Sequence, residues 1–255
     1  PHIIDANRQF RILEGVTEFR RMIDGLRITV LASGTPCTEI MAPEHKEIVI
    51  QHPIPVQNRM CYYYPIGSMS YQERAVTAPK MADAIEQIHG RYNRKTMVHC
   101  AAYGVAKLIY DNMPASTRKI TVLQQDKAER AEDLERFLKA KRGKIMLSVY
   151  FAEGLDLKGP DYPTNIIAKL PFENISDEFV KARNEHDGWR RYNTNTAVTI
   201  MQAAGRCTRS ITDYSETYIL DGSWQGFFNR NKKRFQPWFV AALKTIRSLD
   251  EVVIR

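Results

Sequence analysis

The sequence predicts an α/β fold in which a mostly parallel sheet is flanked by helices. Short runs rich in β-branched residues alternate with longer stretches of helical spacing, which is the signature of βαβ units. The 255 residues are 44% hydrophobic and 26% charged, an ordinary globular composition. A chain of this length can bury a sizeable core, and no internal repeat interrupts it.

The expected elements follow one another in a regular order. Strands are expected where β-branched and aromatic residues cluster, at residues 27–32, 47–51, 59–64, 95–100, 119–123, 144–150, 165–170 and 214–220. Helices are expected where apolar residues recur at helical spacing, at residues 78–90, 102–112, 128–140, 194–207 and 237–249. Gly90 is expected to end the first of these helices, and Pro237 suits the first turn of the last. Residues 174–189 are polar and charged and predict an interruption, and the strand at 214–220 is expected to close the sheet.

The charge balance points to a polyanionic partner. The formal net charge is +8, and lysines or arginines that meet phosphates release condensed counterions. A merely basic surface is the open alternative. The sequence has no apolar run of about 18 residues and no secretory leader at its start, which predicts a protein of the cytoplasm, nucleoid or nucleus with no membrane partner.

The cysteines predict buried thiols. Cys37, Cys61, Cys100 and Cys207 form no C-x-x-C pair, and most stand among apolar or β-branched neighbours. The histidines likewise suggest no metal geometry. We therefore expect neither a metal site nor an iron–sulfur cluster in these residues.

Two stretches carry charges that suit phosphate chemistry. In Gln202-Ala203-Ala204-Gly205-Arg206-Cys207-Thr208-Arg209, two arginines three positions apart at a helix end would present both guanidinium groups to one anion. Upstream, a strand runs into the loop Glu153-Gly154-Leu155-Asp156, which places acids near the carboxyl ends of the strands. A surface arginine pair and a plain capped loop are the structural alternatives.

Aromatic residues precede a basic run near the C-terminal end. Trp224, Phe227 and Phe228 are followed by Arg230, Lys232, Lys233 and Arg234. Core aromatics with a solvated cationic rim are the preferred interpretation, and base stacking beside backbone contacts is the other.

Taken in order, several segments resemble helicase motifs III to VI of the XPD/DinG branch of superfamily 2. They are Ala32-Ser33-Gly34-Thr35-Pro36, then Lys95-Thr96-Met97-Val98-His99-Cys100-Ala101-Ala102-Tyr103, then the acidic loop at 153–156, and finally residues 202–209 with Asp213-Tyr214. Residues 64–70 and Lys169-Leu170-Pro171-Phe172 are also similar to that family. The resemblance covers nearly the whole chain, in order.

The resemblance implies a RecA-like, P-loop-NTPase-type fold for residues 37–255, the second domain of a helicase, with residues 1–36 as the tail of the first domain. It implies ATP and Mg²⁺ held mainly by that first domain, which would be the other partner, and single-stranded DNA, or RNA, across the top. By resemblance the catalytic residues are Arg206, Arg209 and Gln202, and the nucleotide-binding residues are Glu153, Gly154, Asp156 and Gly205. The residues implied to bind the strand are His99, Ala102, Tyr103 and Ser148, although His99 also suits a packed or hydrogen-bonded position.

Some positions depart from the family pattern, and one motif is absent. Ala32 replaces the usual Thr of motif III, Ala102 the usual Ser of motif IV, and Ser215 the Gly of the D-Y-G that follows motif VI. No G-x-x-x-x-G-K-[ST] loop occurs, since Gly143-Lys144 is followed by Ile145. The sequence thus predicts the C-terminal motor domain of an ATP-dependent DNA helicase that does not hydrolyse ATP alone. The alternatives are a stand-alone nucleic-acid-binding or regulatory module without ATPase activity and a structural partner of a separate P-loop subunit.

Overall fold

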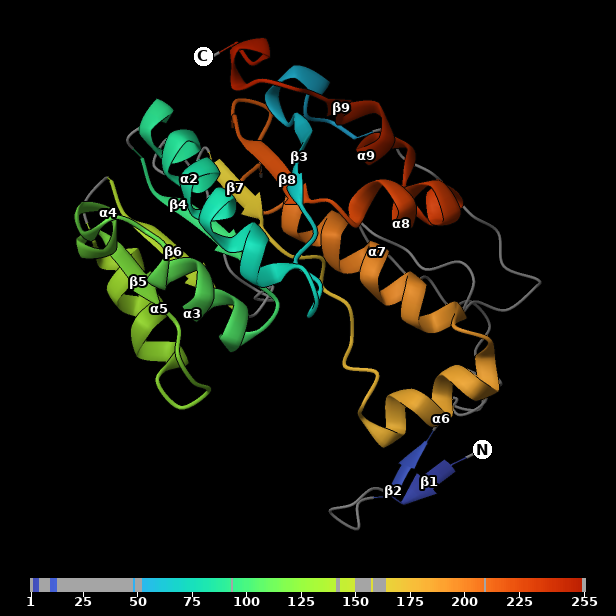
Figure 1. Ribbon diagram of the computed structural model, residues 1–255. Coiled ribbons are helices and arrows are strands. Elements are labelled where there is room, and N and C mark those ends of the chain that lie inside the picture. The colour runs from blue at the N-terminus through green and yellow to red at the C-terminus, as the bar shows by residue number, and fades with distance from the viewer. Residues whose placement is uncertain are drawn as a thin grey trace. The chain divides into compact units, whose positions relative to one another are not determined.

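The fold was analysed in a computed structural model that describes residues 2–4, 10–12, 48, 52–92, 94–140, 143–149, 157, 164–208 and 210–253 (Figure 1). The chain divides into two compact units, residues 1–50 with 172–198 (unit one) and residues 51–171 with 199–255 (unit two). The predicted strands at 27–32 and 47–51 and motif III lie outside the described residues. The domain boundary after residue 36 lies there too and stays a prediction.

Unit two is built on a parallel sheet of seven strands in the order β5-β6-β4-β7-β8-β3-β9. In chain order the strands are β3 (Cys61–Gly67), β4 (Thr96–His99), β5 (Thr121–Leu123), β6 (Ile145–Ser148), β7 (Thr164–Ile167), β8 (Glu216–Asp221) and β9 (Leu243–Thr245). The helices that lie wholly in this unit are α2 (Arg74–Tyr92), α3 (Tyr103–Asp111), α4 (Ala115–Lys119), α5 (Arg130–Lys139), α8 (Trp224–Asn231) and α9 (Pro237–Ala242). The predicted α/β class with a parallel sheet flanked by helices is confirmed.

Alternation along the strands sends side chains to the two faces of this sheet. Val98 and Cys100 pack in one apolar cluster with helices α2 and α3, through residues such as Ile85 and Ile109. Met97 points to the other face, where its cluster includes Phe137 of α5 and Cys207. The layers are therefore helices, sheet and helices, which is what near-continuous apolar strands require.

The C-terminal part of the chain differs from its prediction. The expected helix at 237–249 is wrong beyond Ala242, because Leu243 to Thr245 form β9 on the outer side of β3. Leu243 pairs with Cys61, and the amide of Ile246 donates to the Tyr63 carbonyl at 2.9 Å. Pairing with an open strand edge thus overrides the helical spacing of the sequence, and β9 rather than β8 closes the sheet.

Trp224 and Phe227, before the basic run, lie in the core, as preferred, and Phe228 is half-buried. Trp224 and Phe227 are buried, and the Trp224 ring centroid lies 5.0 Å from that of Phe228. Lys232 and Lys233 are exposed. The predicted burial of thiols is confirmed for Cys61, Cys100 and Cys207, whereas Cys37 lies outside the described residues.

Unit one contributes a two-stranded antiparallel pair, β1 (His2–Ile4) with β2 (Phe10–Ile12), and the helix α6 (Glu178–Asp187). The division between the units falls within α7 (Arg190–Ala204). The expected interruption at 174–189 is wrong where α6 forms. The Asp177 side chain caps this helix by accepting from the amides of Phe179 and Val180 at 2.9 and 3.1 Å, and Gly188 ends it with a φ of 62°.

Candidate functional site

The candidate site lies at the carboxyl edge of the sheet in unit two. Because the strands are parallel, the ends of β4, β6, β7 and β8 meet at this edge. Register places His99 beside Ser148 on one side and beside Ile167 on the other. Open α/β sheets bind their ligands at this edge.

A buried amide connects the end of β4 to the end of α7. Asn165, fully buried in β7, donates from Nδ2 to the carbonyl of Ala203 at 2.8 Å, and its Oδ1 lies 2.8 Å from Nε2 of His99. Only the NH₂ group can donate to a carbonyl, so the Ala203 bond fixes the orientation of the amide. The Oδ1 atom therefore accepts, and Nε2 of His99 carries the proton.

Two more polar side chains extend this buried row toward β5. Ser148 Oγ donates to Oε1 of Gln124 at 3.4 Å, and the amide of Val149 donates to the same oxygen at 2.9 Å. Gln124 and Ser148 are 1% and 3% exposed, and His99 is 1% exposed. His99 and Ser148 therefore offer no surface to a bound strand in this structure, and their assignment to strand binding stays a prediction.

The corner after β4 turns sharply into helix α3. Ala101 adopts a left-handed backbone with a φ of 59°, and Ala102 takes the N-cap position without a side-chain hydrogen bond. The first turn of α3 has no acidic residue, and Ala102 and Tyr103 are half-buried. The methyl group of Ala102 thus leaves the helix start without the cap that Ser provides at this motif position.

Gln202 lies just before the end of α7, and Arg206 lies just after it. Gln202 belongs to the last helical turn, and Arg206 follows the helix in a turn where its amide donates to Ala203 at 3.3 Å. The helix ends at Ala204, short of the predicted end near Cys207, so Arg206 lies beyond it. That Arg206 and Arg209 share one face stays a prediction, because Arg209 lies outside the described residues. Arg206 is 6% exposed, and a Cβ on Gly205 would meet Met201 O at an ordinary 3.5 Å.

Asp221, which the sequence reading missed, ties three strand ends together. Its carboxylate accepts from the amides of Met69, Leu170 and Ser223 at 3.4, 2.9 and 3.0 Å, after β3, β7 and β8 respectively. Lys169 donates to the Met69 carbonyl at 2.8 Å, and burial lowers the pKa of its ammonium group although Asp221 opposes that shift.

The backbone is closely packed next to Asp221, where β3 and β8 end. A Cβ on Gly222 would lie 3.1 Å from the Gly67 carbonyl carbon, so the two strand ends touch through backbone.

Asn165 is a second residue of the site that the sequence reading missed. A polar residue inside an otherwise apolar strand is a signal that could have found it, because buried amides need partners.

Several predicted site residues lie outside the described residues. They are Arg209 after the α7 turn and Glu153, Gly154 and Asp156 of the acidic loop. Within the described ranges, no group of three His, Cys, Asp or Glu side chains could hold a metal ion. No helix among those residues is long and apolar enough to cross a membrane.

Comparison with known proteins defines the class. Residues 85–242 match the family described as the helicase C-terminal domain, and the chain belongs to this family. Together with the parallel sheet and the relatives described next, this makes it a C-terminal helicase domain of the XPD/DinG type with a RecA-like fold.

The individual relatives agree. The chain is 24% identical over 186 residues to the ATP-dependent DNA helicase YoaA of Haemophilus influenzae, covering 70% of this chain and 27% of the relative. The identity to YoaA of Escherichia coli K12 is 25% over 152 residues, covering 57% and 24%. The chain thus spans about a quarter of the length of these curated relatives. A solved structure titled "Structure of S. tokodaii Xpd4" shares the fold, with a TM-score of 0.61, 18% identity, and coverage of 90% of this chain and 47% of the other.

Proposed function

We propose that this domain is the second motor domain of an ATP-dependent DNA helicase and completes an ATP site whose phosphate-binding loop belongs to another domain. Arg206 and Arg209 contact the phosphates, Gln202 senses the bound nucleotide, and Gly205 lets the backbone approach it. Glu153, Gly154 and Asp156 link nucleotide to strand binding. Mg²⁺ is held mainly by the other domain. The curated relatives are named as ATP-dependent DNA helicases, which supports this assignment.

The observation that carries the proposal is the buried link from His99 through Asn165 to Ala203. One end of the link lies at the corner that precedes α3, and the other lies in the helical turn that contains Gln202. A helicase must couple the state of its nucleotide to its grip on the strand. Two buried hydrogen bonds that share the Asn165 amide can move both ends together.

The chemistry of the nucleotide side suits phosphoryl transfer. Negative charge spreads over the oxygens of the transferred phosphoryl group, and an arginine fork stabilises it. Arg206 is buried in this structure, so its guanidinium must leave its present position to reach a phosphate. In this proposal the guanidinium turns toward the phosphates as the second domain closes on the ATP-bearing domain.

The chemistry of the strand side suits a nucleic-acid backbone. The start of α3 lacks a side-chain cap, and a helix start offers the positive end of the helix dipole to an anion. Tyr103, at the first helical position, supplies an aromatic ring on which a base can stack. His99 and Ser148 are buried at the ends of β4 and β6 and hold this corner in position.

A protein that joins this domain to a P-loop domain tests the proposal through nucleic-acid-stimulated ATP hydrolysis. Arg206→Ala is expected to lower the turnover by about 10³, the usual effect of losing a phosphate-stabilising arginine. Arg190→Ala, at an exposed arginine that begins the same helix, is the matched control and keeps full turnover. Thermal midpoints measured in parallel separate lost chemistry from lost folding. A folded Arg206→Ala protein with normal turnover would refute the assignment.

A further inference from the structure

Strand β5 is an edge strand of the sheet, and one of its two edges pairs with no other described strand. It stands at one end of the strand order and pairs only with β6 among the described strands. The amide of Ile145 donates to the Ile120 carbonyl at 3.1 Å, and the amide of Gln124 donates to the Leu147 carbonyl at 3.2 Å. Main-chain groups of a strand alternate in direction, so Ile120, Val122 and Gln124 face β6. Thr121 and Leu123 therefore direct their N–H and C=O groups away from the sheet.

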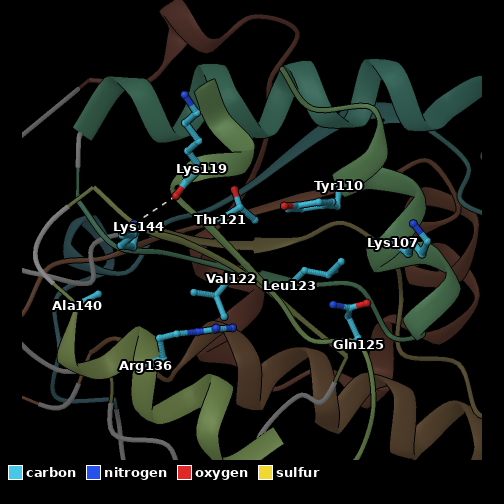
Figure 2. A pocket seen from close by; sticks show the side chains of 10 residues that line it. All are labelled: Lys107, Tyr110, Lys119, Thr121, Val122, Leu123, Gln125, Arg136, Ala140 and Lys144. Atoms are coloured by element: carbon cyan, nitrogen blue, oxygen red, sulfur yellow. Dashed lines mark hydrogen bonds between the residues drawn. The ribbon is translucent and has the colours of Figure 1, made fainter. Parts of the chain in front are cut away.

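A cavity of about 430 Å³ lies along this open side. Its walls come from α3, from the end of α4, from the whole of β5 and from α5, as Figure 2 shows. The lining includes the outward residues Thr121 and Leu123 and the ring of Tyr110. The free edge thus faces a hollow between the helix layers rather than a flat surface.

Four cations surround the hollow: Lys107, Lys119, Arg136 and Lys144. Lys107 is paired with Asp111 at 2.8 Å and Arg136 with Asp133 at 2.7 Å. These carboxylates partly neutralise the two cations. Within the part of the chain that the structure describes, Lys119 and Lys144 have no carboxylate partner, and Lys144 Nζ donates to the Lys119 carbonyl at 3.5 Å. The hollow is therefore electropositive, most strongly near the amino end of β5.

The main-chain pattern decides between two kinds of anion. The outward carbonyls of Thr121 and Leu123 need donors, and the outward amides need acceptors. A phosphate backbone offers acceptors only, whereas an extended peptide offers both in alternation at the spacing of a strand. The cations then favour acidic side chains on that peptide.

We propose that this edge binds an extended, acidic peptide segment of a partner protein, which adds to the sheet as a further strand beside β5. The main-chain hydrogen bonds supply affinity, and Lys119 and Lys144 select for Glu and Asp. This surface flanks the sheet and uses none of the residues assigned to the nucleotide. The inference therefore does not rest on the proposed helicase activity.

The test uses the 255-residue chain and a fluorescein-labelled ten-residue peptide of alternating Glu and Val with uncharged ends. Fluorescence anisotropy at ~20 mM salt and up to ~100 μM protein detects a Kd of about 10⁻⁴ M. We expect binding to the wild type and a loss of about tenfold or more in the double variant Lys119→Glu/Lys144→Glu. The double variant Lys80→Glu/Lys181→Glu, which makes the same charge change at exposed lysines elsewhere, is expected to bind as the wild type does.

Two further probes identify the mode of binding. In a peptide with two adjacent N-methylated central amides, each edge of the peptide strand lacks one N–H donor for pairing with β5. We expect this peptide not to bind. A ten-nucleotide oligothymidylate is expected to bind the Lys119→Glu/Lys144→Glu variant as well as the wild type. The proposal is overturned if the wild type does not bind the acidic peptide, because the lysines then only guard an edge against aggregation. Equal binding of the methylated peptide, or loss of oligothymidylate binding in the lysine variant, also overturns it.

Discussion

At the scale of single residues, Asn165 holds the candidate site together. Its amide is the common partner of His99, 66 positions earlier, and of Ala203, 38 positions later. Such separations explain why sequence reasoning found His99 and Gln202 but not the residue that joins their elements. A motif shows residues that are close in the chain, whereas a hydrogen bond between β7 and α7 exists only once the sheet has formed.

Replacing this amide should lower stability. Asn165→Ala removes two buried hydrogen bonds and opens a small cavity, at a cost of about 3 kcal/mol. Nε2 of His99 loses its acceptor, and the Ala203 carbonyl keeps only the longer bond from the Arg206 amide. Urea unfolding followed by fluorescence measures the free energy of unfolding. Asn229→Ala, at an exposed asparagine of α8, should change it by no more than about 0.5 kcal/mol. Similar values for the two variants would mean that the buried link does not stabilise the fold.

A second buried group at this scale predicts a dependence on pH. Glu216 is fully buried at the start of β8 and accepts hydrogen bonds from the hydroxyls of Tyr92, Tyr214 and Tyr218, the last at 2.6 Å. Burial, and then the negative charge of Glu216, raises the pKa of Tyr218. Burial also raises the pKa values of Tyr92 and Tyr214, with hydrogen bonds to Glu216 as the next cause.

These shifts predict alkaline destabilisation. Above about pH 10 the unfolded tyrosines lose protons that the folded ones keep, so the unfolded state binds fewer protons and the free energy of unfolding falls as pH rises. Each such tyrosine contributes a slope of about 1.4 kcal/mol per pH unit. Between pH 10 and 11 the unfolded tyrosine is only partly deprotonated, so Tyr218→Phe should reduce the slope measured there by about 1 kcal/mol per pH unit. An unchanged slope would contradict the assigned cause.

At the scale of elements, local patterns predicted the central strands and several of the helices, and long-range pairing explains the failure at β9. The run at 95–100 and the helical spacing at 78–90 correspond to β4 and α2, although α2 continues past Gly90 to Tyr92. β9 could not be predicted, because its strand form depends on the open edge of β3. The helix α6 was missed for want of apolar spacing, yet Asp177 and Gly188 mark its two ends in the sequence.

The cap of α6 is therefore expected to matter more than its sparse apolar residues. Asp177→Ala removes the acceptor for two amides of the first turn and should cost about 1 kcal/mol. Amide hydrogen exchange across 178–187, read by mass spectrometry, should accelerate about fivefold. Ser176→Ala changes the exposed residue just before the cap and serves as the control. Equal exchange in both variants would show that the cap contributes little.

At the scale of the whole molecule, the parallel sheet gathers the predicted strand-binding corner and the buried polar row at one edge. The sequence predicted a ligand site at the carboxyl ends of the strands, but it did not predict the buried polar row that contains Asn165. No motif predicts whether the cations lie near the predicted strand-binding corner, because a net charge of +8 does not say where they are. Binding of single-stranded DNA to the intact chain is therefore the test.

We expect the chain to bind single-stranded DNA weakly and without regard to sequence, because backbone contacts carry no base information. With about four phosphate contacts, the slope of log K against log salt is about −3, so affinity falls about 50-fold between ~50 and ~200 mM salt. Tyr103→Ala should weaken binding at every salt concentration and leave this slope unchanged, since base stacking releases no counterions. Anisotropy titrations with oligothymidylate and a mixed-sequence oligonucleotide measure these values. Binding that ignores salt, or none at ~20 mM salt with ~100 μM protein, would exclude a backbone-binding surface on this domain, because non-specific affinities reach Kd values of about 10⁻⁴ M.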